Sequence, residues 1–375
     1  MNVAFYATMK PPDDPIPSGD RQMAGLLIKA LREAGHDVRL ASSLRALSQT
    51  PDEASRHRLK GLALEEAEIL CASWSSPEAN WRPAVWFTYH PYYKAPDWLG
   101  PDVCTRLAIP YVTAEASYAP KRDVGPWRSW QLDVVDAIRR AAVNFCFTER
   151  DKTELMRIEG LQGLFVGLPP FIDRDDAPVA SASRANHDPP RLVSVAMMRS
   201  GDKLASYRLL ANALALLLAT RWELKVIGDG PERGAVHDAF SRIPPERIEW
   251  LGELAPDQVP DHLEACDVYV WPGIGEAYGL AYLEAQAAGL PVVAQRTGGV
   301  PAVVKDGETG CLTPVGDVQA FAESLRQLLV DPAKRTQLGD AGRCFVRRER
   351  TVARAASIID AALRSIMPSA PEPIP

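Results

Sequence analysis

The segment WPGIGEAYGLAYLEAQAAGLPVVA, residues 271–294, decides the fold of the C-terminal half of this sequence. It follows the apolar run VYVW (268–271), which predicts a strand. After a loop of proline and glycine, a helix is expected to open near Tyr278 and to end at Gly289. The run PVVA (291–294) then predicts another strand. This order of strand, loop, helix and strand is typical of a parallel sheet covered by helices.

The same segment has the chemistry of an anion site. A helix N-terminus carries about half a positive charge and unpaired N–H groups, so a helix that opens after a glycine-rich loop suits a phosphate. Glu276 on the loop would present a carboxylate to hydroxyls, and Glu284, about one turn into the helix, could reach a ribose diol. Each glutamate alone fits an exposed or capping residue equally well. Their spacing, the glycines and the flanking strands together favour a ligand site.

The elements around this segment predict a second doubly wound domain in the C-terminal half. Short apolar runs alternate there with helical patterns over about 150 residues, which is the sequence pattern of a parallel α/β sheet. The expected strands are 192–196, 223–228, 248–252, 268–271 and 291–294, and the expected helices are 204–218, 232–241 and 280–288.

A similar pattern predicts a first α/β domain in the N-terminal half. A helix spans Met23 to Ala34 and ends at Gly35. The expected strands are 3–7, 38–41, 69–72, 84–88, 111–114 and 144–147.

These elements divide the chain into parts. We expect an N-terminal domain over 1–171, a linker rich in Pro, Ala, Ser and Asp over 172–190, and a C-terminal domain over 191–350. A helix over 351–366, packing back on the first domain, and a flexible tail over 367–375 would complete the chain. Ligands of such sheets bind beyond the carboxyl ends of the strands, which places a cleft between the two domains.

Composition excludes several classes of protein. The 375 residues are 46% hydrophobic and 24% charged, which fits a folded chain and not a disordered one. The net charge of -6 lacks the basic excess of a polyanion binder, so nucleic acid is not expected as a partner. The six cysteines form no C-x-x-C pair, and neither a signal peptide nor a transmembrane run is evident, so we expect a cytoplasmic protein.

The sequence resembles the family 4 glycosyltransferases of GT-B fold. That family has two glutamates separated by seven residues, as Glu276 and Glu284 are here. The resemblance is strong over about 190–330 and weak over the N-terminal half. Further matching stretches are IGDGPE (227–232), WLGE (250–253), TGGVPAVV (297–304) and DGETGCL (306–312).

This resemblance implies a fold of two Rossmann-like, doubly wound domains that face a central cleft, with a nucleotide-sugar donor in the C-terminal one. Arg199 and Lys203 match the basic pair that grips the diphosphate, and their chemistry suits a leaving diphosphate. Glu276 would contact the hydroxyls of the sugar and Glu284 the ribose. The amides of Tyr278, Gly279 and Leu280 would lie near the phosphate or the sugar. The backbone at Gly252 and Glu253 would lie near the base.

The N-terminal domain would bind the acceptor. Gly19 lies in the loop where the family has glycines close to the donor phosphate, although a helix N-cap explains Ser18 and Asp20 equally well. His90 follows a strand end, where the family often has a histidine that faces the sugar; a structural loop histidine is the alternative. Six of the nine tryptophans lie between residues 74 and 130. They are either core residues or aromatic residues that line the acceptor site.

The implied reaction is the transfer of a sugar, with retention of anomeric configuration, to a hydroxyl of a glycan, lipid or small molecule. Glu276, Lys203, Arg199 and His90 would carry it, without a metal or another cofactor, and peripheral contact with a membrane stays open. The acidic residues of 173–175 sit in the expected linker and do not have the strand-end context of a metal motif.

Two alternatives remain. One is a GT-B protein that binds nucleotide sugars without catalysis. The other is a dinucleotide-dependent oxidoreductase, which the missing G-x-G-x-x-G after the first strand disfavours.

Overall fold

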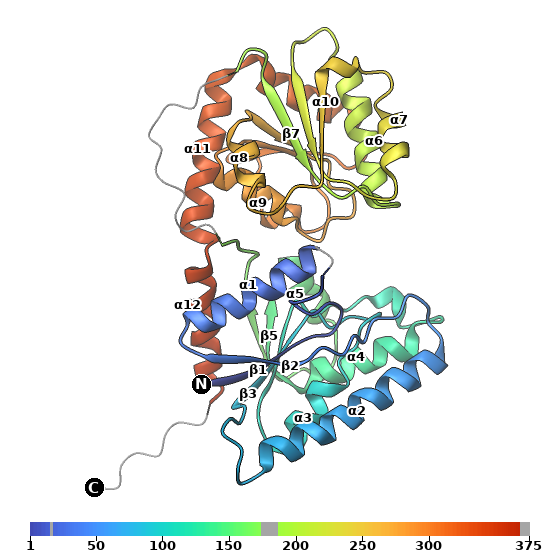
Figure 1. Cartoon of the computed structure of the whole chain (residues 1–375), viewed down its shortest axis with the longest axis vertical. Coiled ribbons are helices and arrows are strands. Elements are labelled where there is room, and N and C mark those ends of the chain that lie inside the picture. Colours follow the sequence, from blue (N-terminus) through green and yellow to red (C-terminus); the bar gives the residue numbers. More distant parts are fainter. Residues whose placement is uncertain (16–17, 174–186, 368–375) are drawn as a thin grey trace, which may run out of the picture. The chain divides into compact units, whose positions relative to one another are not determined.

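Two six-stranded sheets, in which every paired strand is parallel, organise the chain (Figure 1). The computed structural model describes residues 1–15, 18–173 and 187–367. Unit 1 combines Met1–Pro169 with the C-terminal segment that begins at Val352, and unit 2 is Pro170–Thr351. Most of the expected linker and all but the first residue of the expected tail lie outside the described residues.

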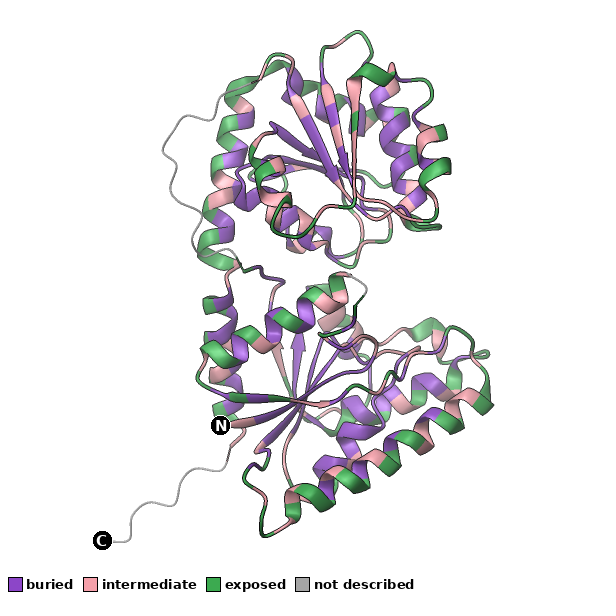
Figure 2. Cartoon of the chain, in the orientation of Figure 1, coloured by how far each residue is buried: buried purple, intermediate pink, exposed green. Residues whose placement is uncertain are grey.

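The sheet of unit 1 has the strand order β2-β1-β3-β4-β5-β6. Its central strands are buried on both faces, as parallel strands with helices on both sides must be (Figure 2). The strands are β1 (Asn2–Ala7), β2 (Asp37–Ser42), β3 (Val85–Tyr89), β4 (Tyr111–Ala114), β5 (Ala141–Cys146) and β6 (Leu164–Gly167).

Helices cover both faces of this sheet. Figure 1 shows α1 and α12 on one face and α2, α3 and α4 on the other. Helix α12 packs against α1, so the C-terminal helix of the chain belongs to the N-terminal unit. The helices are α1 (Gly19–Glu33), α2 (Glu53–Ser75), α3 (Leu99–Leu107), α4 (Arg128–Arg140), α5 (Glu149–Leu155) and α12 (Val352–Ser365).

The expected strand over 69–72 is wrong, because these residues lie inside helix α2. The apolar run there is short, and a run of that length fits a strand or a helix equally well. The deciding pattern is longer: Leu59, Ala63, Ala67 and Cys71 are buried at a spacing of four residues, so they share one helix face. Ile69 points away from that face and is 69% exposed.

The aromatic segment of unit 1 forms core more than surface. Trp86 and Trp130 are fully buried, and Trp98 and Trp127 are nearly so. Together with apolar residues of α2 and α3 they fill the space under one face of the sheet. Tyr92 and Tyr93 are half-buried, so they are among the aromatic residues of this segment that keep some exposed surface.

The sheet of unit 2 has the strand order β12-β11-β10-β7-β8-β9. The strands are β7 (Arg191–Val195), β8 (Glu223–Ile227), β9 (Ile248–Gly252), β10 (Val268–Val270), β11 (Val292–Gln295) and β12 (Gly310–Thr313). The helices are α6 (Asp202–Ala215), α7 (Arg233–Ala239), α8 (Val259–Glu264), α9 (Leu280–Ala287), α10 (Val318–Val330) and α11 (Pro332–Glu349). The alternation that the sequence predicts over 192–294 is therefore confirmed.

Helix α2, with 23 residues, is the longest helix in the described part of the chain, and charged residues occur along it. Within the same described residues, no helix has both the length and the apolar character that crossing a bilayer requires.

Candidate functional site

The strand order of unit 2 creates a switch point between β7 and β10, and we call the region between the loops that diverge there the crevice. From β7 the chain proceeds to β8 and β9 on one side, and it returns to β10 on the other side of β7. The loops that leave β7 and β10 therefore diverge although the two strands are neighbours. Such a switch point, at the carboxyl ends of the strands, is where open α/β sheets bind ligands.

The loop after β7 supplies two cations. Gly201, at φ +74°, caps helix α6, and Lys203 lies in the first turn of that helix. The amide of Leu204 donates to the carbonyl of Arg199 at 3.1 Å, which ties the two cationic residues into one turn. Lys203 is half-buried and Arg199 is exposed. The structure thus places both residues at the end of β7, Lys203 with its side chain paired to Glu276 and Arg199 exposed.

The loop after β8 packs closely on this turn because it contains two glycines. A Cβ atom on Gly228 would overlap the carbonyl oxygen of Ala196, and one on Gly230 would overlap that of Met198. Gly228 also donates its amide to the carbonyl of Gly252 at 2.7 Å. Gly252, at φ +69°, ends β9, and the neighbouring Glu253 is exposed. The glycines of the IGDGPE and WLGE stretches therefore shape the crevice from the β8–β9 side.

The loop after β10 is built on glycines with positive φ. Gly273, Gly275 and Gly279 have φ values of +74°, +69° and +81°. A side chain on Gly273 would meet the hydroxyl of Tyr282, and one on Gly275 would meet the carboxylate of Asp202. Gly279 is the N-cap of α9, so the helix starts where the sequence predicts. The first amides of a helix have no partner four residues earlier within it; in α9 the amide of Tyr282 bonds instead to the carbonyl of Gly279 at 3.2 Å.

Glu276 lies at the centre of this loop and is held by two donors. Its Oε1 atom forms an ion pair with Nζ of Lys203. The same oxygen accepts a hydrogen bond from the indole N–H of Trp271 at 3.0 Å. The structure therefore brings together two of the residues that the sequence predicts as a phosphate ligand and a sugar ligand.

Glu284 is half-buried on α9 and shares an electrostatic environment with Glu276. Burial raises the pKa of Tyr269 well above its usual value, and the charges of Glu276 and Glu284 raise it further. Both carboxylates are therefore close enough to this buried hydroxyl to disfavour its anion. Tyr278 and Leu280, at the start of the helix, are buried, so they can present backbone to a ligand but little side-chain surface.

Two features of the crevice escape the sequence predictions. The first is Trp271, whose donor role is visible only once Glu276 is placed beside it. The second is the loop of the TGGV stretch: a side chain on Gly298 would overlap the carbonyl oxygen of Glu276, and the amide of Gly299 lies 3.4 Å from that oxygen. A run of two glycines after a strand is the signal that could have pointed to this second contact.

Unit 1 has a switch point of its own between β1 and β3. Thr8 follows β1, and its hydroxyl donates to the carbonyl of His90, which follows β3, at 2.9 Å. The imidazole Nδ1 of His90 lies 2.9 Å from a carboxylate oxygen of Asp20. Gly19, the first residue of α1, is exposed and has open space where a side chain would be. Ser18 caps α1 by accepting from the amide of Arg21, so its role is the N-cap.

A buried carboxylate that the sequence does not single out completes this cluster. Glu115 follows β4, is 7% exposed, and accepts a hydrogen bond from the hydroxyl of Tyr89 at 2.9 Å. Both His90 and Glu115 have φ +55°, a conformation that residues other than glycine rarely adopt. A glutamate directly after the apolar strand YVTA is the weak signal that could have identified it.

The charges of this cluster depend on one another. Burial lowers the pKa of His90, but the carboxylates of Glu115 and Asp20 outweigh burial and raise it to about 9. Burial raises the pKa of Glu115 to about 7 against the opposing charge of His90. Burial also raises the pKa of Asp20, but its hydrogen bond with His90 outweighs this and keeps the pKa below the usual value. His90 is therefore a cation at pH 7.

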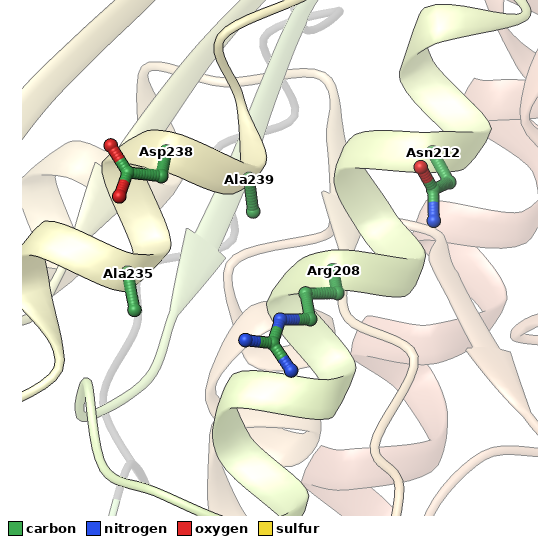
Figure 3. A pocket seen from close by; sticks show the side chains of 5 residues that line it. All are labelled: Arg208, Asn212, Ala235, Asp238 and Ala239. Carbon is green, nitrogen blue, oxygen red and sulfur yellow. The ribbon is translucent and has the colours of Figure 1, made fainter.

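The hollow between α6 and α7 is separate from these strand ends. It has a volume of about 400 Å³. Figure 3 shows Arg208 and Asn212 extending from one helix, with Ala235, Asp238 and Ala239 on the other. None of the residues that the sequence predicts for the site lines it. We therefore assign it no part in the site.

Metal ligands are not gathered anywhere in the described residues: these contain no group of three or more His, Cys, Asp or Glu side chains placed to hold an ion. The acidic residues of 173–175, which the sequence analysis considered as a metal motif, lie outside the described residues except for Asp173.

Comparison with known proteins gives three results. Residues 189–331 match the family model described as glycosyl transferases group 1. The chain is 27% identical, over 75% of its length, to a D-inositol 3-phosphate glycosyltransferase of Streptomyces avermitilis, of which the match covers 67%. The matched segments cover between 22% and 67% of the curated relatives they match.

Two solved structures are similar over nearly the whole chain. Sucrose-phosphate synthase of Thermosynechococcus elongatus has a TM-score of 0.72 at 19% identity, and the match covers 97% of this chain and 98% of that one. Anabaena HepE in complex with UDP has a TM-score of 0.70 at 16% identity, with 98% and 100% covered. These likenesses confirm the predicted GT-B fold.

Proposed function

We propose that this chain transfers a sugar from a nucleoside diphosphate to an acceptor hydroxyl, because residues 189–331 of its unit 2 match the family model described as glycosyl transferases group 1. One observation carries this proposal. Lys203 and Glu276, from loops 73 residues apart, meet at the switch point of the sheet, beside a helix N-terminus made accessible by glycines. A cation, a carboxylate and free amides are the groups that a diphosphate joined to a polyol requires.

The donor would bind as follows. Lys203 and Arg199, together with the amides at the start of α9, neutralise the diphosphate. Glu276 accepts hydrogen bonds from sugar hydroxyls, and Glu284 accepts them from the ribose. The base lies along the backbone at Gly252 and Glu253, where the exposed position of Glu253 leaves room for it.

The reaction breaks the bond between the anomeric carbon and the diphosphate oxygen, and it forms a bond from the same carbon to the acceptor oxygen. The acceptor proton passes to an oxygen of the leaving diphosphate. Because the acceptor attacks from the face on which the diphosphate departs, the anomeric configuration is retained. The cations of the site stabilise the charge that develops on the diphosphate, which is why the reaction needs no carboxylate nucleophile.

Unit 1 would bind the acceptor, with Gly19 and His90 near the reacting groups. With a pKa of about 9, His90 is protonated at pH 7. Its Nδ1–H then donates to Asp20, which leaves Nε2–H as a donor to a sugar or acceptor oxygen. The acceptor would be a glycan, a lipid or a small molecule that carries a hydroxyl group.

The proposal includes a metal-independent reaction in the cytoplasm, with peripheral contact to a membrane if the acceptor is a lipid. Lys203 and Arg199 take the part that a divalent cation plays in other phosphoryl sites. Added EDTA should then leave the rate unchanged, and stimulation by Mg²⁺ or Mn²⁺ would contradict this point.

The test is a binding screen followed by an activity measurement. The purified chain is heated with UDP, GDP and ADP and with a glucose or mannose sugar of each, and the hydrolysis of each sugar nucleotide is then followed. We expect thermal stabilisation by one nucleotide family and slow release of its diphosphate. Stabilisation without any turnover, with or without candidate acceptors, would instead identify a binding protein, and no stabilisation would refute a donor site.

A further inference from the structure

Glu276 uses one of its two carboxylate oxygens for contacts within the protein. Lys203 and the indole N–H of Trp271 both reach Oε1. Among the described residues, no group donates a hydrogen bond to Oε2, so this oxygen keeps its full capacity as an acceptor. The carboxylate is thus anchored at one end and available at the other.

Trp271 is itself held rigidly. It is 2% exposed, and its amide donates to the carbonyl of Val293 on the neighbouring strand at 3.0 Å. Its ring lies edge-on to Tyr207 with centroids 4.8 Å apart, and Tyr282 donates its hydroxyl to the carbonyl of Trp271 at 3.1 Å. Because backbone and ring are both fixed, the direction of the indole N–H is fixed as well.

The same ring also contacts the cation of the site. Nζ of Lys203 lies 5.5 Å from the ring centroid of Trp271, within reach of a cation–π interaction. Lys203 and Tyr207 are four residues apart on α6, so both face Trp271 from one side of that helix. One buried side chain therefore contacts both Lys203 and Glu276, two of the charged residues of the proposed donor site.

The two anchors of Glu276 differ in what a ligand would do to them. A bound diphosphate attracts Lys203 and competes with Glu276 for its ammonium group. The indole N–H of Trp271 is buried and cannot follow, so it still holds Oε1 after the lysine has changed partner.

We propose that Trp271 is a positioning residue that keeps Glu276 oriented toward the sugar of a nucleoside-diphosphate sugar once Lys203 has turned to the diphosphate. This inference rests on the proposed function. It predicts that the indole N–H matters for the sugar-dependent step and not for binding of the bare nucleoside diphosphate.

The test compares Trp271→Phe with Trp222→Phe. Trp222 is a matched control in the same unit: it is 1% exposed, its indole N–H donates at 3.0 Å to a backbone carbonyl, and the guanidinium of Arg247 lies over its ring. We measure kcat and KM for hydrolysis of UDP-, GDP- and ADP-glucose, and inhibition by UDP, GDP and ADP. We expect Trp271→Phe to lower kcat/KM on the order of 10-fold, with inhibition by the bare diphosphate unchanged.

Several results would overturn the inference. If Trp271→Phe changes kcat/KM no more than Trp222→Phe, or if it weakens nucleotide inhibition by the same factor, Trp271 is only a packing residue. If Trp271→Phe lowers kcat/KM as much in a Glu276→Gln background as alone, it does not act through Glu276.

Folding and the proposed function are controlled separately. If Trp271→Phe does not fold, Trp271→His, which keeps an aromatic N–H, is compared with Trp271→Leu: higher kcat/KM in the histidine variant supports the inference, and equal values overturn it. If the unmodified chain neither binds a nucleotide nor hydrolyses a sugar nucleotide, both the proposed function and this inference are wrong. If it does both and Trp271→Phe is indistinguishable from it, only the inference fails.

Discussion

Both units have a switch point in their sheet, but the residues that follow the strands there differ in backbone conformation and in the kind of charged group. In unit 2 the loop after β10 is rich in glycine, and the charged groups Lys203 and Glu276 are half-buried and form an ion pair. In unit 1 the residues after β3 and β4 are His90 and Glu115, which adopt positive φ without being glycine.

This difference indicates a division of tasks. In unit 2, a cation paired with a carboxylate beside a helix N-terminus suits a diphosphate joined to a polyol. The pKa values of about 9 and about 7 for His90 and Glu115 make unit 1 sensitive to pH near neutrality. Under the proposed function, His90 and Glu115 would make the acceptor side titratable near neutral pH. Four measurements test this contrast between the two units.

The largest effect is expected from Lys203→Ala. Loss of the cation that neutralises the leaving diphosphate should lower kcat/KM by roughly 100- to 1000-fold, with little change in melting temperature. Lys225→Ala is the control, because Lys225 pairs with Glu249 at 3.4 Å on the same sheet and has no place in the site. Activity equal to that of the unmodified chain would disprove the donor-site assignment.

The next effect concerns Glu284→Ala. Loss of its contacts to the ribose should weaken nucleotide binding by about 1.5–3 kcal/mol, or roughly 10- to 150-fold in Kd. Calorimetry with the nucleotide that stabilises the chain measures this change. The exposed Glu323, which pairs with Arg326, provides the control substitution. An unchanged Kd would show that the ribose does not meet Glu284.

A third effect separates backbone strain from crowding in unit 2. Gly279 and Gly316 have similar φ values, +81° and +77°. A Cβ on Gly279 would lie 2.7 Å from the ring of Tyr282, whereas one on Gly316 would meet nothing within 4 Å. Gly279→Ala should therefore cost about 1–3 kcal/mol more in unfolding free energy than Gly316→Ala, and it alone should weaken nucleotide binding. Equal costs in denaturant titrations would mean that the start of α9 tolerates a shift.

The smallest effect tests the titratable cluster of unit 1. Because burial raises the pKa of Glu115 to about 7 from 4.5, the folded state binds more protons than the unfolded state, and stability falls as pH rises through this range. His90 acts in the same direction: its contribution is complete below 6.5 and is lost as pH rises through about 9. Glu115→Gln should therefore gain roughly 1–2 kcal/mol relative to the unmodified chain between pH 5 and pH 8.

Urea titrations at the two pH values measure this gain. The exposed Glu68→Gln is the control and should show no such dependence on pH. A difference between the Glu115 variant and the unmodified chain that does not change with pH would show that Glu115 does not titrate near neutrality.

Local sequence patterns were sufficient to predict the α/β class of both units, and they singled out Lys203 and Glu276, which meet at the switch point of unit 2. Apolar runs that alternate with helical patterns are local features, and so are the glycines that allow the loop before α9 to turn. The short run at 69–72 gave a wrong prediction, because it lies inside a helix whose buried face includes residues as distant as Leu59.

Only the tertiary structure decided which of these residues meet. Lys203 and Glu276 form a pair because β7 and β10 are neighbours in the sheet, and no pattern within either loop contains that strand order. The same holds for Trp271, which follows β10 and whose role depends on the contact with Glu276. It holds also for Glu115, whose pKa depends on burial and on His90. Contacts over long sequence separations follow from topology, and topology follows from the packing of the whole sheet.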